Sequence, residues 1–423
     1  MLKSALLLIM ASPFLSSAPP VQLNTDSAKE PPIIVYGESL KDSDRDLQAC
    51  IRSKCPTDKD IAATLRHAEN LFIAGDYVKA RRTLLASRRR NQRFSREYPI
   101  QVANLLRANA RVAEHLGEGE AARLGTLDVL SALKSGLPDD HPRVLGARVE
   151  LADSLARNGR IEAADMEYRA VARRGKELGL ATIEGYGLLR LAAMYTALAE
   201  GDPGTYRLAA KRAVETLITN GNPGLTVFAN AGRVIKARSD FRSGDRNAVD
   251  ALISSFQLQS AQATPTLLFT PNIATNPSVR DGVNLGVSGV ENPLFGTNSA
   301  VQQLAVNNFD DQWVDIGFWV GADGKVHDAA IMRESERLSK HWISPVLASI
   351  NGRRYAPISL QENDPGIFRI ERYTYTSQWT TRTGSNIRVR GNQPRIEMLD
   401  LSPVAGKPAT ENGPVPAREQ RPA

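Results

Sequence analysis

Histidines are the side chains of this sequence best suited to acid–base chemistry or metal binding near neutral pH. The five are His67, His115, His141, His327 and His341. None stands in a His-Glu-x-x-His arrangement or in another metal-ligand spacing. His67 adjoins Ala68 in a helical stretch and is interpreted as structural, and His141 belongs to the turn-like stretch Asp-Asp-His-Pro. His327 and His341 could meet in the C-terminal part, but no carboxylate partner accompanies them. We therefore expect no catalytic residue and no metal site.

A serine nucleophile is equally poorly supported. The stretch Gly286–Gly289 is one residue too short for the Gly-x-Ser-x-Gly motif, and it lies in a linker-like segment. No Gly-x-x-x-x-Gly-Lys phosphate loop is present. The paired acids Asp139-Asp140 and Asp310-Asp311 fit helix starts or turns better than an acid–base dyad. We therefore expect a protein that is not an enzyme and has no cofactor. An envelope hydrolase that depends on Ser288 or His327 is the enzymatic alternative.

The two cysteines, Cys50 and Cys55, are five residues apart. In an exported protein such a pair usually forms a disulfide, which here would fix a local turn before the first repeat. A metal site would need two further ligands close by, and the sequence shows none. A pair of free thiols is the remaining alternative.

A strongly basic stretch runs from Lys79 to Arg96. The residues in it that could contact a partner are Arg81, Arg82, Arg88, Arg89, Arg90 and Arg93. These side chains could form a solvated helix face, or they could dock an acidic partner, an anionic lipid or an anionic cell-wall polymer. Nucleic acid is a poor candidate because the chain carries an export signal and few aromatic residues interleave with the arginines.

The N-terminus predicts export. Met1 to Lys3 form a short basic start, Ala5 to Leu15 are almost wholly apolar, and small residues follow up to Ala18. This order is typical of a secretory signal peptide, so residues 1–18 are predicted to be cleaved and the protein to be periplasmic. The apolar run is too short to span a bilayer, and no later segment resembles a membrane span. Residues 19–59 are predicted to be a flexible lead-in.

Glycines recur at a fixed period through a stretch rich in Ala, Leu and Arg. They are Gly75, Gly117, Gly159, Gly201 and Gly244, separated by 42, 42, 42 and 43 residues. Glycine permits the left-handed backbone that closes a helix, so each should mark a turn between two helices. Because no single helical hairpin buries enough surface to be stable, residues 60–258 are predicted to form an all-α stack of repeats, a solenoid.

The residues around these glycines resemble the tetratricopeptide repeat. The first unit has Ala68, the turn Gly75-Asp76-Tyr77 and Ala80, and the third unit repeats this pattern up to an aromatic residue, Tyr168. The resemblance implies a concave surface that holds a partner helix or peptide. Tyr77 and Tyr168 are candidate contacts, although packing aromatics are usually buried.

The composition changes after Leu258. Residues 259–308 have little charge and many Gly, Pro and Asn, which predicts a linker, with a strand possible at Thr266–Phe269. A small α+β domain is then predicted at 309–392. Its strands are expected at Gln312–Val320, at 326–335 and at 366–379, with a helix at 338–351 before the third strand. A further strand is expected at 386–390, and a disordered tail at 393–423.

This β-β-α-β order resembles the C-terminal domain of TonB, the periplasmic energy transducer of Gram-negative bacteria. The matching residues are the hydrophobic strand before Asp323–Val326, the helix leading to Arg354–Pro357 and the final aromatic strand. The chain departs from the family because it has a repeat domain in place of a membrane anchor with a Pro-rich spacer. The part of the resemblance that carries over is a domain that offers a strand edge to a peptide.

These expectations give two functional hypotheses. The first is a periplasmic, non-catalytic adaptor whose repeat array and TonB-like domain each bind other envelope proteins or peptides. The alternative is a TonB-related energy transducer or transport accessory that acts on outer-membrane receptors.

Overall fold

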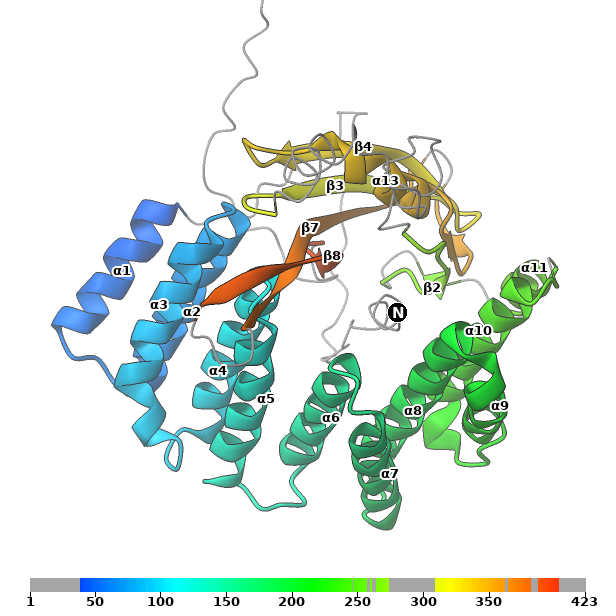
Figure 1. Cartoon of the computed structure of the whole chain (residues 1–423), viewed down its shortest axis with the longest axis horizontal. Coiled ribbons are helices and arrows are strands. Elements are labelled where there is room, and N and C mark those ends of the chain that lie inside the picture. Colours follow the sequence, from blue (N-terminus) through cyan, green and yellow to red (C-terminus); the bar gives the residue numbers. More distant parts are fainter. Residues whose placement is uncertain are drawn as a thin grey trace, which may run out of the picture.

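The computed structural model describes residues 39–245, 247–256, 259–260, 264–273, 309–361, 364–381 and 387–402. Within these ranges a helical region precedes a region built on an antiparallel sheet, as predicted (Figure 1). The predicted signal peptide, most of the predicted linker and the tail after Ser402 lie outside the described residues. None of the helices in the described part combines the length and the apolar character needed to cross a membrane.

The helical region forms an arc of antiparallel helices (Figure 1). The helices are α1 (Leu40–Arg52), α2 (Thr57–Ile73), α3 (Tyr77–Asn91), α4 (Pro99–His115), α5 (Gly119–Lys134), α6 (Pro142–Arg157), α7 (Ile161–Glu177), α8 (Ala181–Gly201), α9 (Pro203–Ile218), α10 (Thr226–Arg242) and α11 (Ala248–Ser255). Helix α1 corrects the prediction of a flexible lead-in over 19–59. The Ser39 side chain caps its N-terminus, and Leu47 is buried. The disulfide between Cys50 and Cys55 joins the end of α1 to the turn before α2, as predicted.

Four of the five periodic glycines close a helix in the left-handed conformation. Gly75, Gly117, Gly159 and Gly244 have φ angles of +87°, +75°, +77° and +114°. In each case the amide of the following residue bonds back to the carbonyl five positions earlier, as Asp76 does to Leu71 at 2.9 Å. This is the bonding of a Schellman cap. Gly201 is different, because it is the last residue of α8 and its φ is not positive.

Small residues allow the helices of each hairpin to pack closely. The periodic alanines are all buried, and they are Ala68, Ala80, Ala110, Ala122, Ala152 and Ala164. Larger side chains complete the core, with Leu71, Leu84 and Leu106 in one apolar cluster and Tyr168 in the next. The stack therefore buries a core along its length, as expected for units that are not stable alone.

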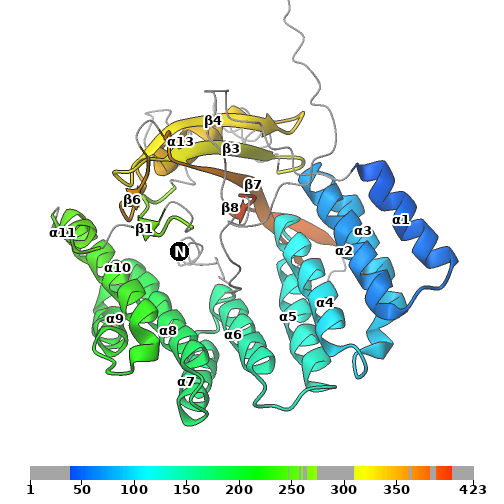
Figure 2. The ribbon, with the colours of Figure 1, turned by 180° about the vertical axis from the view of Figure 1, so that it is seen from behind.

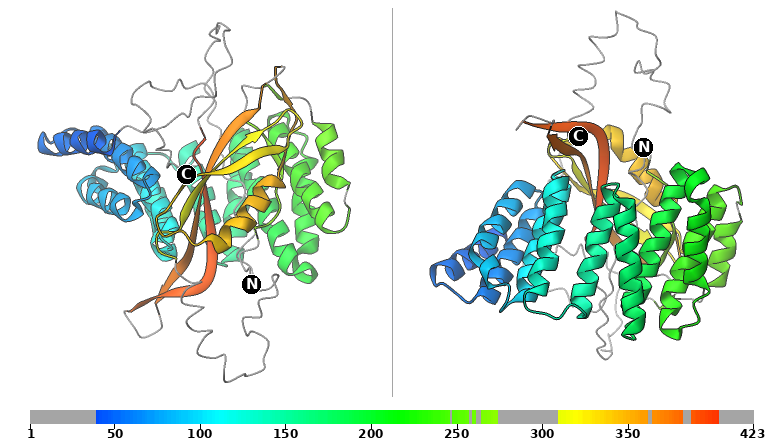
Figure 3. Two further views of the ribbon diagram at one scale, coloured as in Figure 1. Left: turned by 90° about the horizontal axis from the view of Figure 1, so that it is seen from above. Right: turned by 60° about the horizontal axis from the view of Figure 1, so that its bottom comes forward.

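The sheet region contains four main antiparallel strands. They are β3 (Trp313–Val320), β4 (Val326–Glu334), β7 (Ile367–Thr381) and β8 (Arg388–Asp400), in the spatial order β4-β3-β7-β8. A short 3-10 helix (Lys340–Trp342) leads into α13 (Ile343–Asn351), and its residues share an apolar core with Val314, Ile316 and Phe318. Figure 3 shows α13 lying across the sheet.

Two predicted boundaries of this region are wrong. The fourth strand is much longer than the expected 386–390, so the segment 393–400 of the predicted disordered tail is ordered as part of β8. The predicted linker contains β1 (Gln259–Ser260), which pairs with β6 (Ile358–Ser359). The strand expected at Thr266–Phe269 is present as β2 (Leu267–Phe269) and pairs with β5 (Arg354–Tyr355). Both corrections have the same cause, because these strands are stabilised by partners far away in the sequence.

The sheet region lies across the open side of the helical arc (Figures 1 and 2). At one end, β2 packs on α10, where Arg238 donates to the carbonyl of Leu268 and Phe241 meets Phe269 with 5.1 Å between the ring centroids. At the other end, β7 contacts the first two helical hairpins through Thr374, which lies 3.0 Å from the Tyr77 hydroxyl. The two regions are therefore fastened to one another at both ends of the arc.

Candidate functional site

The arginines of the predicted basic surface fall into two groups in the structure, those in ion pairs with other helices and those that are exposed. Three of its arginines hold helices together: Arg81 pairs with Glu118 at 3.2 Å, Arg88 with Asp128 at 2.9 Å and Arg90 with Asp60 at 2.7 Å. These three guanidinium groups are committed to contacts within the chain. Exposed residues make up the other half of the predicted set, namely Arg82, Arg89 and Arg93. Only this half presents charge to a partner.

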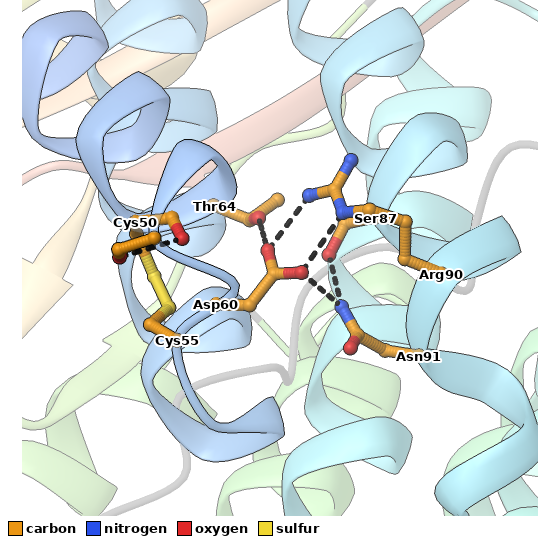
Figure 4. The surroundings of a disulfide bond; sticks show 8 residues. Cys50, Cys55, Asp60, Thr64, Ser87, Arg90 and Asn91 are labelled. Carbon is orange, nitrogen blue, oxygen red and sulfur yellow. Dashed lines mark hydrogen bonds and ion pairs between the residues drawn. A yellow bond between two sulfur atoms is a disulfide. The ribbon is translucent and has the colours of Figure 1, made fainter.

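Asp60 shows why an arginine of this stretch is structural (Figure 4). Its carboxylate accepts hydrogen bonds from Arg90, Asn91 and Thr64 across the α2–α3 hairpin. Burial acts to raise its pKa, but the hydrogen bonds from Arg90 and Asn91 outweigh burial and hold the pKa below its ordinary value. The disulfide between Cys50 and Cys55 lies beside this cluster (Figure 4). The cluster therefore stabilises the first hairpin.

The two tyrosines considered as partner contacts are both buried. Tyr168 is fully covered, and its hydroxyl donates to Asp153 at 2.6 Å inside the α6–α7 hairpin. Tyr77 is 7% exposed and contacts the C-terminal sheet. Both are therefore core residues, so neither can touch an external partner.

The histidines likewise have local partners. His67 lies 3.0 Å from the Ser43 hydroxyl, and His141 caps α6 by accepting from the Arg143 amide. His327 faces Asp323, whereas His341 contacts Ser339, so the structure gives these two separate partners. Among the described residues no group of three or more His, Cys, Asp or Glu side chains could hold a metal ion. Ser288 lies outside the described residues.

The most elaborate constellation of polar side chains is one that the sequence did not suggest. We call it the helix–sheet junction, and it joins β3, β7 and β8 to the turns after α2 and α4. Its centre is Arg372 of β7, whose side chain is wholly buried. Arg372 pairs with the equally buried Asp315 at 2.6 Å and donates to the carbonyl of Ile73 at 2.7 Å. It also donates to the carbonyl of Phe72 and lies over the Trp313 ring.

This arrangement answers two electrostatic needs at once. The last carbonyls of α2 have no partner within the helix, and they carry the negative end of the helix dipole. The Arg372 guanidinium donates to the Ile73 carbonyl and adds a second bond to the Phe72 carbonyl, which also accepts from the Gly75 amide. The Asp315 carboxylate neutralises the buried cation. Arg333 of β4 completes the network by binding the same carboxylate at 2.6 Å. The junction is thus a satisfied ionic network of the kind that fixes one docking geometry.

Thr374, two residues after Arg372 on β7, makes a second polar contact with the helices. The Thr374 hydroxyl is 3.0 Å from the Tyr77 hydroxyl and 3.0 Å from Nδ1 of His115. Burial raises the pKa of Tyr77 to about 12. Burial, together with the positive charges of Arg372, Arg111 and Arg395, lowers the pKa of His115 to about 3. At neutral pH both rings are therefore uncharged, as a closely packed contact requires.

The periodic glycines take part in the junction through their missing side chains. A Cβ on Gly75 would overlap the Trp313 ring, and one on Gly117 would overlap the carbonyl oxygen of Ser377. The main chains also bond directly, because the Trp379 amide donates to the Gly117 carbonyl at 2.9 Å. Gly159 has open space instead. The periodic glycine thus allows the sheet to approach at Gly75 and Gly117, whereas at Gly159 it serves only the turn between two helices.

In the described part of the chain, one long edge of the sheet, that of β4, has no partner strand. β4 is the outer neighbour of β3, and the side chains on its second half include Ile331 and Met332, which are 40% and 42% exposed. The pairing register with β3 shifts between Asp315 and Ile316 and again between Gly317 and Trp319. Such bulges shorten the run of regular hydrogen bonds that an edge can offer.

The junction could have been partly suspected from β7. Both faces of this strand mix apolar and polar residues, as in Ile370 and Arg372 on one face and Glu371 and Tyr373 on the other. In a small sheet, a strand with polar residues on both faces can be solvated on both sides, or its charged side chains can be buried with partners from another part of the chain. The sequence does not distinguish these two cases.

Comparison with protein-family models, with curated proteins and with solved structures finds no match to this chain.

Proposed function

We propose that this chain is a periplasmic, non-catalytic adaptor that brings envelope proteins or peptides together. In this proposal the helical region is a tetratricopeptide-like array, and the sheet region is a domain similar to the C-terminal domain of TonB. The sequence pattern of residues 1–18, which is typical of a secretory signal peptide, supports the location. Tyr77, Tyr168 and His115 are engaged in packing, and His141 caps a helix, which favours binding over catalysis.

The observation that carries the proposal is the exposed edge of β4. Strand β7 cannot accept a peptide, because it lies between β3 and β8 and is docked on the helices. The other edge strand of the sheet is β8, and part of it is covered, since Glu397 is buried. Among the described strands β4 pairs with β3 alone, and Ile331 and Met332 present apolar surface beside the edge that has no partner there. An extended peptide that adds to a sheet gains main-chain hydrogen bonds from the edge and specificity from the side chains.

The bulges of β4 define what such a peptide should look like. Regular pairing is interrupted near Met332 and again near Asp328, which has a φ of +52°. A partner can therefore make only a few main-chain bonds, and its affinity must come from side chains. The chemistry of Ile331 and Met332 favours a short extended peptide with apolar residues at alternate positions.

A crosslinking experiment tests this function. The full chain is incubated with an envelope extract, and crosslinked peptides are identified by mass spectrometry. We expect crosslinks to residues 326–334 and protection of β4 amides from hydrogen exchange. The double variant Ile331→Arg/Met332→Arg should lose both signals. Met166→Arg, which changes a 70% exposed apolar residue on α7, is the matched control and should keep them.

The helical array would supply a second contact through its exposed arginines. The triple variant Arg82→Glu/Arg89→Glu/Arg93→Glu should lose partners whose binding weakens with salt, because exposed charges are screened at high ionic strength. Crosslinks at β4 should survive in this variant. If neither surface gives a specific crosslink in the intact envelope, the adaptor proposal fails.

The alternative proposal is a TonB-related transport accessory. It is supported by the order β3, β4, α13 and β7, which is the order that suggested the resemblance. It predicts that Ile331→Arg/Met332→Arg impairs the uptake of a nutrient imported through a TonB-dependent outer-membrane receptor. Normal uptake together with lost envelope crosslinks would support the adaptor instead.

A further inference from the structure

The helix–sheet junction contains a titratable group that its neighbours cannot accommodate in charged form. His115 lies at the end of α4, is 8% exposed, and places Nδ1 3.0 Å from the Thr374 hydroxyl of β7. Phe72 packs against its ring edge-on, with 4.8 Å between centroids, and Tyr77 lies 5.7 Å away. Helices α2, α3 and α4 and strand β7 therefore enclose the imidazole.

The charged groups that act on this ring are all positive. They are Arg111 on α4, Arg372 on β7 and Arg395 on β8. The nearby acids are already engaged, because Asp315 is bound by Arg372 and Glu397 by Arg395. A second proton on His115 would thus add a cation to a buried site that lacks a free carboxylate. Separation of the sheet from the helices would give the same ring access to water.

We propose that the helix–sheet junction is an acid-sensitive latch, in which protonation of His115 releases the C-terminal sheet from the first two helical hairpins. The latch goes beyond the adaptor function and does not depend on it. Release uncovers the turns after α2 and α4 together with the inner face of β7. Acidification thereby changes the surface that the helical array presents.

The direction of the effect follows from linkage. The docked state holds His115 with a pKa of about 3, against an ordinary value of 6.5. The docked state therefore binds this proton more weakly, and docking is favoured above pH 6.5 and lost as the pH falls. Between pH 7.5 and pH 5.0 the docking equilibrium constant should fall about 30-fold from this group alone.

Glu397 acts in the opposite direction and must be separated from His115. Burial, together with the charge of Glu114, raises the pKa of this carboxyl above its ordinary value. It gains a proton in the docked state as the pH falls, which favours docking. A variant with Glu397→Gln removes this contribution and should show the His115 effect in full.

The test uses hydrogen exchange of the full chain at pH 7.5 and 5.0, corrected for intrinsic rates. The Trp379 amide bonds to the Gly117 carbonyl across the junction and reports docking. The Tyr375 amide bonds to the Gln312 carbonyl within the sheet region and reports its folding. We expect protection of Trp379 to fall at pH 5.0, more strongly in Glu397→Gln, while Tyr375 stays protected.

Two histidine variants make the test specific. His115→Gln cannot gain the proton, so its Trp379 amide should stay protected at pH 5.0. His67→Gln is the matched control, since His67 is also 8% exposed and beside a hydroxyl but lies at the α1–α2 contact. It should behave like the unmodified chain. Equal acid sensitivity in His115→Gln, or loss of Tyr375 protection together with Trp379, would overturn the latch.

A direct titration covers the case in which His115→Gln does not fold. The ring resonances of His115 in the unmodified chain are followed by NMR from pH 7.5 downwards. A ring that stays neutral until the Trp379 amide loses protection supports the latch. A simple titration near pH 6.5 with the junction intact would refute it.

Discussion

Arg372 of β7 donates a hydrogen bond at 2.7 Å to the main-chain carbonyl of Ile73, a residue 299 positions earlier in the chain. The contact joins the middle of a strand to the end of α2, where a helix has no partner of its own for its last carbonyls. Asp315 supports the same guanidinium from β3. The two regions of the protein are therefore joined by buried, directional bonds as well as by apolar packing.

The first prediction concerns this arginine. Arg372→Met should destabilise the folded chain by about 3–5 kcal/mol, because it removes the buried cation of Asp315 and leaves this carboxylate with only the half-exposed Arg333. Urea unfolding measures the change. Arg169→Met is the control, since Arg169 makes an exposed pair with Asp165 and should cost less than about 1 kcal/mol. Similar losses in the two variants would contradict a special role for Arg372.

The second prediction compares glycines that look alike in the sequence. Gly159→Ala should cost about 1–2 kcal/mol, the ordinary penalty for a side chain in the left-handed conformation. Gly75→Ala and Gly117→Ala should cost clearly more, because the new methyl groups meet Trp313 and the Ser377 carbonyl. Both should also expose the Trp379 amide to exchange. If Gly75→Ala, Gly117→Ala and Gly159→Ala had equal free energies of unfolding, close packing of the sheet against the turns at Gly75 and Gly117 would be contradicted.

The third prediction concerns the disulfide. Reduction of Cys50–Cys55 should destabilise the α1–α2 hairpin by about 2 kcal/mol, the loop entropy of so short a ring. The effect should be local, so hydrogen exchange should rise in residues 40–60 and stay unchanged in α7–α9. The double variant Cys50→Ser/Cys55→Ser should reproduce it without reductant. A loss of protection along the whole array would be inconsistent with this prediction.

The fourth prediction concerns the buried carboxyl of Glu397. Burial, with the charge of Glu114, raises its pKa above the ordinary 4.5 in the folded chain. Its stabilising contribution is therefore complete below pH 4.5 and is lost as the pH rises through the raised pKa. Glu397→Gln should accordingly gain stability relative to the unmodified chain from pH 4.5 to 8, as measured by urea unfolding.

Glu120→Gln provides the control of opposite sign. The hydrogen bond from Arg123 lowers the pKa of Glu120, so its contribution is present above pH 4.5 and is lost as the pH falls. This variant should lose a little stability at neutral pH and nothing in acid. If both variants showed the same pH dependence, the assignment of the buried proton to Glu397 would be wrong.

Much of the local structure could be predicted from the sequence. Gly75, Gly117, Gly159 and Gly244 follow helical stretches and do close helices, because the left-handed cap needs a residue without a Cβ. The alternating apolar residues of Gln312–Val320 do form a strand with one face in the core. The cysteine pair also bonds as expected. Each of these features depends on residues close together in the chain.

Other features were predicted wrongly or missed. Gly201 does mark the turn between α8 and α9, but without the left-handed backbone of the other four glycines. The strand after Ile387 continues to Asp400 because β7 supplies its partners. Half of the predicted basic patch, namely Arg81, Arg88 and Arg90, forms ion pairs with acidic residues of other helices or their caps. A run of arginines has the same sequence pattern whether or not an acid from another helix faces it.

By itself the sequence determined most of the turns between helices, the main strands up to β7, and that an all-α part precedes a sheet. Only the tertiary structure decided that the sheet packs against Gly75 and Gly117 but not against Gly159. It also decided that Arg372 contacts the end of α2 and that His115 contacts β7. The physical reason is the range of the forces involved. Helix caps and periodic burial depend on residues close together in the chain. The environment of a buried charge or ring is set by groups that folding brings close from hundreds of residues away.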